Sequence, residues 1–275
     1  MASSEPVGSP RAGLLDPSRL PHAPNFRDLG GLPAEAGRQL RHGVLFRSGA
    51  LSTLTAAEAR YLRDELGVRT VLDLRTADEG AQSPSRELAA AGAAVHPLPL
   101  DRETTYAYEA WQGCASAGEF DVTDGYLGYL RNSGDTLAHG LRALSQPGAL
   151  PAVVHCTLGK DRTGVFTALL LRCLGVDVDA VARDYARSQP AVPAVLASLA
   201  PDSDHHAAFR RLPAWATSAH PETVARLLAR VEEDYGGVLG WAASVGVADA
   251  TLQQLRGALL RPGQASTQDD RTPAE

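Results

Sequence analysis

The feature that most constrains this chain is a strand-like run followed at once by a tight loop and a helix. Residues 151–154 are apolar and predict a short buried strand. Residues 163–174 are rich in Leu and Ala and predict a helix that Gly175 ends. Between them, five residues separate Cys156 from Arg162. The loop therefore ends at a helix N-terminus, where unpaired N–H groups and the helix dipole favour a bound anion.

The residue types in this loop suit a thiolate that attacks a bound phosphate. The helix terminus favours an ionised sulfur on Cys156 for the same reason that it favours an anion. Arg162 offers a planar fork that can bind two phosphate oxygens and the charge that develops during transfer. The expected phosphate-binding residues are Thr157, Leu158, Gly159, Lys160, Asp161, Arg162 and Thr163. Among them, Thr163 would place a hydroxyl near the sulfur.

The stretch resembles the phosphate-binding loop of the cysteine-based tyrosine phosphatases, His-Cys-x5-Arg-Ser/Thr-Gly. The matching residues are His155, Cys156, Arg162, Thr163 and Gly164. The run Gly159-Lys160-Asp161 resembles the bacterial branch that includes secreted mycobacterial and listerial enzymes, with protein phosphatase and phosphoinositide phosphatase activity. The plainer interpretation is a buried free cysteine behind a strand, but it leaves the surrounding Gly, Lys, Asp and Arg unexplained.

Three shorter segments also match the pattern of this branch. They are Asn25-Phe26-Arg27-Asp28-Leu29-Gly30-Gly31, Arg47-Ser48-Gly49 and Asp73-Leu74-Arg75. From the residues alone, the first is a turn with charges, and Arg47 is more simply a solvated arginine at a strand end. Asp73 interrupts an apolar strand, where a carboxylate is costly unless it is paired, and Arg75 or Arg47 could pair with it. We therefore expect Asp73 to organise the site rather than to donate a proton.

The general acid is the least determined part of the site. Many tyrosine phosphatases carry an aspartate on a separate loop upstream of the cysteine, and Asp121 and Asp124 stand in that region without the usual flanking Trp-Pro. The resemblance implies that the aspartate of the phosphate loop matters, which here is Asp161. The predicted order is Asp161 first, Asp73 second, and Asp101 or Asp124 after them.

Lys160 would place a second cation beside the phosphate. Such a cation suits highly charged ligands such as phosphoinositides, or phosphopeptides with acidic neighbours; the alternative is a solvated loop lysine. We expect a phosphoprotein or a phosphoinositide as substrate, with phosphate or another oxyanion in the loop. No cofactor and no metal are expected, because Arg162, Lys160 and the amides already supply positive charge. His205-His206 lacks partners at metal-ligand spacing.

Composition limits the other classes of function. The chain has 275 residues, 44% hydrophobic and 21% charged, with a net charge of −6, which argues against non-specific nucleic-acid binding. The 3 cysteines, Cys114, Cys156 and Cys173, do not form a disulfide framework. No apolar run is long enough to span a membrane, and residues 1–20 show no signal peptide. We expect a cytoplasmic protein without stable membrane insertion; the sequence leaves open export by another route.

Alternating strands and helices predict an α/β fold with a central, mostly parallel sheet flanked by helices. Strands are expected at 43–47, 69–74, 94–98 and 151–154, and helices at 55–66, 84–91, 124–144, 163–174, 176–187, 221–235 and 251–260. A single domain would span residues 21–262, between a disordered lead at 1–20 and a disordered tail at 263–275. The resemblance implies a helical lid at about 188–220. Residues 101–124 have no clear pattern and could form a wall of the cleft or a surface excursion.

Two other classes of protein remain possible from the sequence. A rhodanese-like sulfurtransferase also holds a cysteine in an amide-lined loop, although Thr163-Gly164 and the five-residue spacing speak against it. A non-catalytic phosphate-binding module usually lacks the cysteine or the arginine, and both are present here. The sequence does not determine the oligomeric state.

Overall fold

The computed structural model describes residues 15–100, 122–198 and 218–263. Its centre is a five-stranded sheet in the order β1-β4-β7-β5-β6. The strands are β1 (Arg27–Asp28), β4 (Leu45–Ser48), β5 (Thr70–Asp73), β6 (Ala94–Pro97) and β7 (Ala152–His155). Four of them run parallel, and only β1 pairs antiparallel, with β4. The predicted α/β class with a mostly parallel sheet is confirmed.

The register of the sheet brings three sequence motifs to one edge. His155, the last residue of β7, is paired with Ser48 of β4 on one side and with Asp73 of β5 on the other. Cys156 follows His155 directly, so the predicted loop leaves the carboxyl end of the central strand. Ligands bind at this end of parallel sheets in most open α/β proteins.

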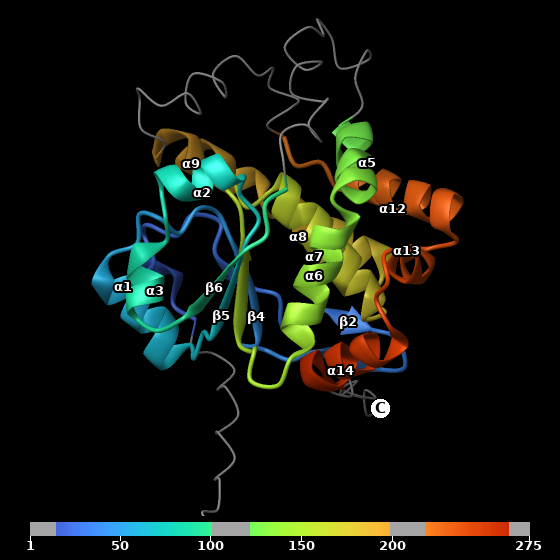
Figure 1. Cartoon of the computed structure of the whole chain (residues 1–275), viewed down its shortest axis with the longest axis horizontal. Coiled ribbons are helices and arrows are strands. Elements are labelled where there is room, and N and C mark those ends of the chain that lie inside the picture. Colours follow the sequence, from blue (N-terminus) through green and yellow to red (C-terminus); the bar gives the residue numbers. More distant parts are fainter. Residues whose placement is uncertain (1–14, 101–121, 199–217, 264–275) are drawn as a thin grey trace, which may run out of the picture.

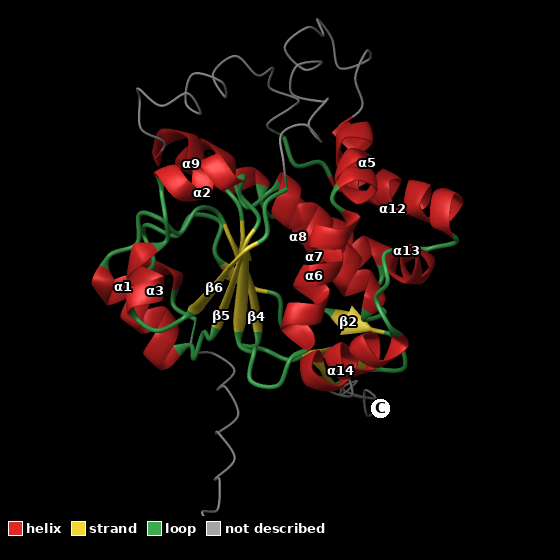
Figure 2. Ribbon diagram, in the orientation of Figure 1, coloured by secondary structure: helices red, strands yellow, loops and turns green. Residues whose placement is uncertain are grey.

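Helices cover both faces of the sheet (Figures 1 and 2). On one face lie α1 (Ala56–Arg60), continued by a π-helical turn at Tyr61–Glu65, and α3 (Arg86–Ala90). On the other lie α6 (Gly134–Ser145), α7 (Asp161–Cys173) and α8 (Val178–Ala186). Strand side chains alternate between the two apolar clusters: Val153 faces α1 and α3, whereas its neighbour Val154 faces α7.

The remaining elements complete the second layer and the edge that carries the loop. They are α2 (Ala77–Gln82), α5 (Val122–Asn132), a 3₁₀ turn at Gln189–Ala191, α9 (Val192–Ser198), α12 (Pro221–Tyr235), α13 (Val238–Ser244) and α14 (Asp249–Leu259). The expected helix at 124–144 is two helices, α5 and α6, which are separated at Ser133. A capping box starts α1, since the side chains of Thr55 and Glu58 bond each other's backbone N–H groups. Among the described helices, none combines the length and apolar character that crossing a membrane requires.

Some boundaries differ from the sequence predictions. At the end of the expected disordered lead (1–20), Pro17–Arg19 form a 3₁₀ turn and Leu20 is buried, so these residues belong to the folded domain. The helix expected from residue 176 begins at Val178, after the Asp177 cap. A second sheet, β2 (Pro33–Ala34), β3 (Arg38–Leu40) and β8 (Leu260–Pro262), was not predicted, because strands of two or three residues carry too little periodicity. Cys114, His205-His206 and most of the 101–124 segment lie outside the described residues.

Candidate active site

The cysteine lies at the base of a tightly folded loop. Cys156 is 2% exposed, and its Sγ accepts a hydrogen bond of 3.3 Å from the backbone N–H of Gly159. Gly159 has a φ of +66°, and a Cβ there would lie 2.3 Å from the carbonyl oxygen of Ser48. Only glycine fits this position, and it is the residue that turns its N–H toward the sulfur.

Three successive carbonyl groups of the loop are bound from the protein side. The backbone N–H of Ala50 donates to Thr157 (2.9 Å), and Asn25 Nδ2 donates to Leu158 (3.1 Å) and Gly159 (3.0 Å). Arg47 adds a 2.7 Å bond to the Gly159 carbonyl. Carbonyl oxygens held on this side leave the loop N–H groups free to face the opposite way, as an anion site requires. The motifs around Asn25 and Arg47 therefore shape the loop.

Arg162 is held by a carboxylate that the sequence analysis missed. Glu79 of α2 binds both terminal nitrogens of Arg162, at 2.5 Å and 3.0 Å, and accepts a 2.7 Å bond from the hydroxyl of Thr157. Burial alone would raise the pKa of Glu79, but the charge and hydrogen bonds of Arg162 outweigh it, and the pKa falls far below its ordinary value. Glu79 is thus an ionised anchor that orients the arginine.

Asp161 and Lys160 form the other charged pair of the loop. Lys160 is fully buried; its Nζ lies 3.1 Å from Asp161 Oδ1 and donates a 2.9 Å bond to the carbonyl of Ser218. The alternative of a solvated loop lysine is therefore wrong. Asp161 Oδ1 also accepts a 2.5 Å bond from the hydroxyl of Tyr126. Ser218 belongs to the expected lid segment, so one end of that segment contacts the loop.

Asp73 ends β5, the strand next to β7, and both of its carboxylate oxygens are paired. Arg75 binds both of its oxygens, at 2.9 Å and 2.6 Å, and His155 Nε2 lies 3.6 Å from Oδ1. Burial alone would raise the pKa of Asp73, but His155 and Arg75 together outweigh it, and the net direction is down. An ionised, doubly bound carboxylate fits the organising role. Burial lowers the pKa of His155 to about 4, so its ring is neutral at pH 7.

A buried ion cluster supports the loop from below. Asp184 of α8 pairs with Arg47 (2.7 Å) and with Arg27 (2.8 Å). All three side chains are at least nine-tenths buried. Arg47 therefore does not pair with Asp73, and it is not a solvated arginine at a strand end. The cluster fixes the position from which Arg47 binds Gly159.

The remaining predicted residues have different surroundings. Thr163 is buried, and no described group hydrogen-bonds its hydroxyl. Asp124 is 65% exposed and lies 3.8 Å from Arg230 of α12. Asp101 and Asp121 lie outside the described residues. At the two ends of the expected lid, the N–H of Ala219 donates a 2.5 Å bond to Gln189; that the segment covers the loop stays a prediction.

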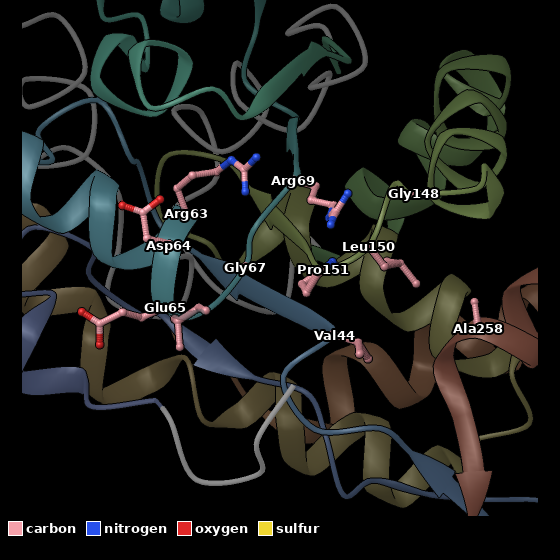
Figure 3. Close-up of a pocket in the computed structure, with 11 residues that line it drawn as sticks. Val44, Arg63, Asp64, Glu65, Gly67, Arg69, Gly148, Leu150, Pro151 and Ala258 are labelled. Atoms are coloured by element: carbon pink, nitrogen blue, oxygen red, sulfur yellow. The ribbon is translucent and has the colours of Figure 1, made fainter. Parts of the chain in front are cut away.

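A separate pocket lies at the opposite end of the sheet. It measures about 730 Å³ and is lined by residues that precede the strands, among them Val44, Arg69 and Pro151. Figure 3 shows Arg69 beside apolar Leu150 and Pro151. None of the predicted site residues lines this pocket. The chemistry of the loop therefore resides at the carboxyl edge of the sheet.

A parallel sheet that presents a cysteine–arginine phosphate loop at the end of its central strand defines the class of cysteine-based phosphatases. The pattern of the Tyrosine phosphatase family matches residues 18–261. The chain is 32% identical to the Triple specificity protein phosphatase PtpB of Mycobacterium tuberculosis, over 88% of this chain and 98% of that protein. It is 31% identical to a tyrosine-protein phosphatase of Nostoc commune, over 85% of this chain and 79% of that protein. This chain belongs to the tyrosine phosphatase family of enzymes.

Among solved structures, the core catalytic domain of the PP-IP phosphatase SIW14 from S. cerevisiae, in complex with citrate, aligns with a TM-score of 0.39 at 15% identity. That alignment covers 76% of this chain and 93% of the other.

Several side chains that bind the loop or support it were not found by sequence reasoning. They are Glu79, Asp184, Tyr126 and Tyr185. Only Glu79 carried a local signal, because Thr76 and Glu79 form a capping box that marks the start of α2. That signal places the carboxylate at a helix start but does not reveal Arg162, 83 residues away in the sequence.

Proposed function

We propose that this chain hydrolyses phosphate monoesters, phosphotyrosine in proteins first among them, through a cysteinyl-phosphate intermediate. The observation that carries the proposal is the phosphate loop itself. Three carbonyls are bound from behind, the Gly159 N–H bonds the sulfur, and Glu79 aligns Arg162. A phosphate dianion would bind the loop N–H groups and those N–H groups of Arg162 that Glu79 does not use.

The reaction divides into two displacements. The Cys156 thiolate attacks phosphorus in line, the phosphorus–oxygen bond of the leaving group breaks, and a general acid gives that oxygen a proton. Water then attacks the phosphocysteine, releasing phosphate and the thiolate. Arg162 and the helix terminus stabilise the charge on the equatorial oxygens in both steps.

Asp161 is the best-placed acid among the described candidates. Both oxygens of Asp73 bind Arg75, and Asp124 is largely exposed beside Arg230. In Asp161→Asn, turnover should fall steeply for alkyl phosphates and less for aryl phosphates, whose leaving groups need less help. Equal losses on both would remove Asp161 from that role.

The range of substrates extends the proposal. The mycobacterial relative is named a triple specificity phosphatase. Lys160 adds positive charge close to the loop, which suits phosphoserine, phosphothreonine and phosphoinositide substrates as well. Its charge is shared with Asp161. An anionic group on the substrate would therefore compete with Asp161 for the ammonium.

The experiment compares wild type, Cys156→Ser and Lys160→Ala on a phosphotyrosine peptide, a phosphoserine peptide and inositol lipids. Cys156→Ser should abolish turnover on all of them, and Lys160→Ala should reduce inositol lipid turnover more than phosphotyrosine turnover. A burst of para-nitrophenol from para-nitrophenyl phosphate would reveal the intermediate. The family assignment removes the sulfurtransferase alternative, and an inactive wild type on every monoester would favour the non-catalytic module.

A further inference from the structure

The two oxygens of Asp161 have different surroundings. Oδ1 accepts the 2.5 Å bond from Tyr126 and lies 3.1 Å from the ammonium of Lys160. Within the described part of the chain, no hydrogen bond engages Oδ2. The carboxyl group is 20% exposed. One oxygen is anchored to two donors, and the other is left to carry a proton.

A second tyrosine stands behind the first. Tyr126 of α5 and Tyr185 of α8 have hydroxyl oxygens 2.7 Å apart, and their rings meet edge-on at 6.4 Å between centroids. Both rings are buried, and both helices pack on α7, which begins at Asp161. Burial raises the pKa of both phenols, so the two hydroxyl groups keep their protons at neutral pH.

The loop motif makes room for this pair. A Cβ on Gly164 would lie 2.9 Å from Cδ2 of Tyr185, so any larger residue would push the ring away. Gly164 is the last residue of the His-Cys-x5-Arg-Thr-Gly motif. Its lack of a side chain therefore couples the motif to the tyrosine pair.

The chemistry of the three groups fixes which one donates in each hydrogen bond between Tyr185, Tyr126 and Asp161. An ionised carboxylate can only accept hydrogen bonds, so the hydroxyl of Tyr126 donates a hydrogen bond to Asp161 Oδ1. The Tyr126 oxygen then accepts a hydrogen bond from the hydroxyl of Tyr185. With Oδ1 taken by Tyr126 and Lys160, a proton that Asp161 acquires resides on Oδ2.

We propose that Tyr126 and Tyr185 are positioning residues that hold Asp161 by Oδ1 and thereby present Oδ2 as the acid to the leaving group. The inference rests on the proposed function, in which Asp161 is the general acid. It extends that function by naming what orients the acid. Without Tyr126, the carboxyl group keeps only Lys160 and can rotate toward the N–H groups at the start of α7.

The test uses full-length Tyr126→Phe and Tyr185→Phe with two substrates. Phenyl phosphate has a poor leaving group, and para-nitrophenyl phosphate has a good one. General acids contribute roughly a hundredfold to ten-thousandfold, so loss of orientation in Tyr126→Phe should lower kcat on phenyl phosphate about tenfold. The loss on para-nitrophenyl phosphate should stay below about threefold, and Tyr185→Phe should show the same pattern more weakly. Tyr185→Phe also keeps the test decisive if Tyr126→Phe does not fold.

Tyr61→Phe is the matched control. Tyr61 is a buried tyrosine whose hydroxyl accepts a 2.9 Å bond from the Asp16 N–H, in the cluster on the other face of the sheet. Its removal should leave the ratio of the two kcat values unchanged. The double variant Asp161→Asn/Tyr126→Phe should be no slower than Asp161→Asn alone, because the tyrosine acts only through the acid.

The outcomes separate this inference from the proposed function. The proposed function stands if Asp161→Asn lowers kcat more on phenyl phosphate than on para-nitrophenyl phosphate. The positioning role is then overturned if Tyr126→Phe lowers kcat equally on both substrates. It is also overturned if Tyr126→Phe lowers kcat further in the double variant with Asp161→Asn. If Cys156→Ser retains full activity, or wild type hydrolyses neither substrate, the proposed function fails first. A tenfold loss confined to phenyl phosphate and absent on the Asp161→Asn background supports the positioning role.

Discussion

The carboxylate of Glu79 binds the guanidinium of Arg162 through two hydrogen bonds, and the same carboxylate accepts the hydroxyl of Thr157. Glu79 also closes the capping box that starts α2. One buried side chain thus fixes a helix start, the near end of the loop and the arginine. The arginine reaches the phosphate site with its orientation already set, which lowers the entropy lost on binding.

Replacing Glu79 with Gln should misalign Arg162, because one of the two acceptor oxygens becomes an NH2 group, which can only donate and would face a guanidinium N–H. We expect kcat/KM to fall by about tenfold to a hundredfold, the range typical of a displaced catalytic group. Steady-state kinetics with para-nitrophenyl phosphate measures this. The control is Glu65→Gln, which breaks a similar two-bond pair with Arg19 at an exposed site. An unchanged kcat/KM in Glu79→Gln would show that the loop orients Arg162 alone.

Asn25→Gly should loosen the loop without straining the backbone. Asn25 has a φ of 61°, which glycine adopts freely, so the change removes only the side-chain amide, which donates to the Leu158 and Gly159 carbonyls and accepts from Arg27. We expect a loss of about 1–3 kcal/mol in the free energy of unfolding and weaker inhibition by vanadate. Ala36→Gly, at a φ of 56°, is the matched control and should leave both unchanged. Equal vanadate inhibition in the two variants would contradict the role given to Asn25.

Asp184→Asn should leave two buried arginines without their counter-ion. Burial, together with the charge of Arg47, lowers the pKa of Arg27 to about 10 even with Asp184 present. Removal of the carboxylate should lower the free energy of unfolding by about 3–5 kcal/mol, as for other broken buried pairs. Urea denaturation measures it, and Asp179→Asn, an exposed position on the same helix, is the control. A loss under about 1 kcal/mol would show that the cluster relaxes around the vacancy.

Acid should destabilise the fold through His155 before the carboxylates respond. Burial holds the pKa of His155 at about 4 in the folded chain, against an ordinary value of 6.5. Between these values the unfolded chain takes up a proton that the folded chain refuses, so stability falls as the pH falls from 6.5 to 4. The full effect is about 3 kcal/mol.

The pH dependence of urea unfolding, with the ring of His155 followed by NMR, measures this effect. The lowered pKa values of Glu79 and Asp73 remove stability only below their ordinary values of 4.5 and 3.8. The two contributions are therefore separated along the pH axis. A His155 ring that titrates near pH 6.5 would show that water reaches it.

Much of the site followed from the sequence because its determinants are local. The apolar run at 151–154 indicates the strand, and the Leu- and Ala-rich run at 163–174 indicates the helix. The spacing between Cys156 and Arg162 indicates the loop between them. The parallel sheet follows from alternating elements, since short connections force the carboxyl ends of the strands to one edge. Cys156, Arg162 and Asp73 therefore come together without any knowledge of tertiary contacts.

Only the tertiary structure decided which side chains form ion pairs and hydrogen bonds with the site residues. In the sequence, 83 residues separate Glu79 from Arg162 and 137 separate Arg47 from Asp184. Tyr126 and Asp161 are 35 residues apart. No pattern of propensity or period links such pairs, because each forms only when separate helices pack on the sheet. Lys160 shows the difference most clearly, since its charge was readable in the sequence but its burial against Asp161 was not. Local order is encoded in neighbouring residues, whereas the choice of ion pair depends on which side chains the packed core brings within reach.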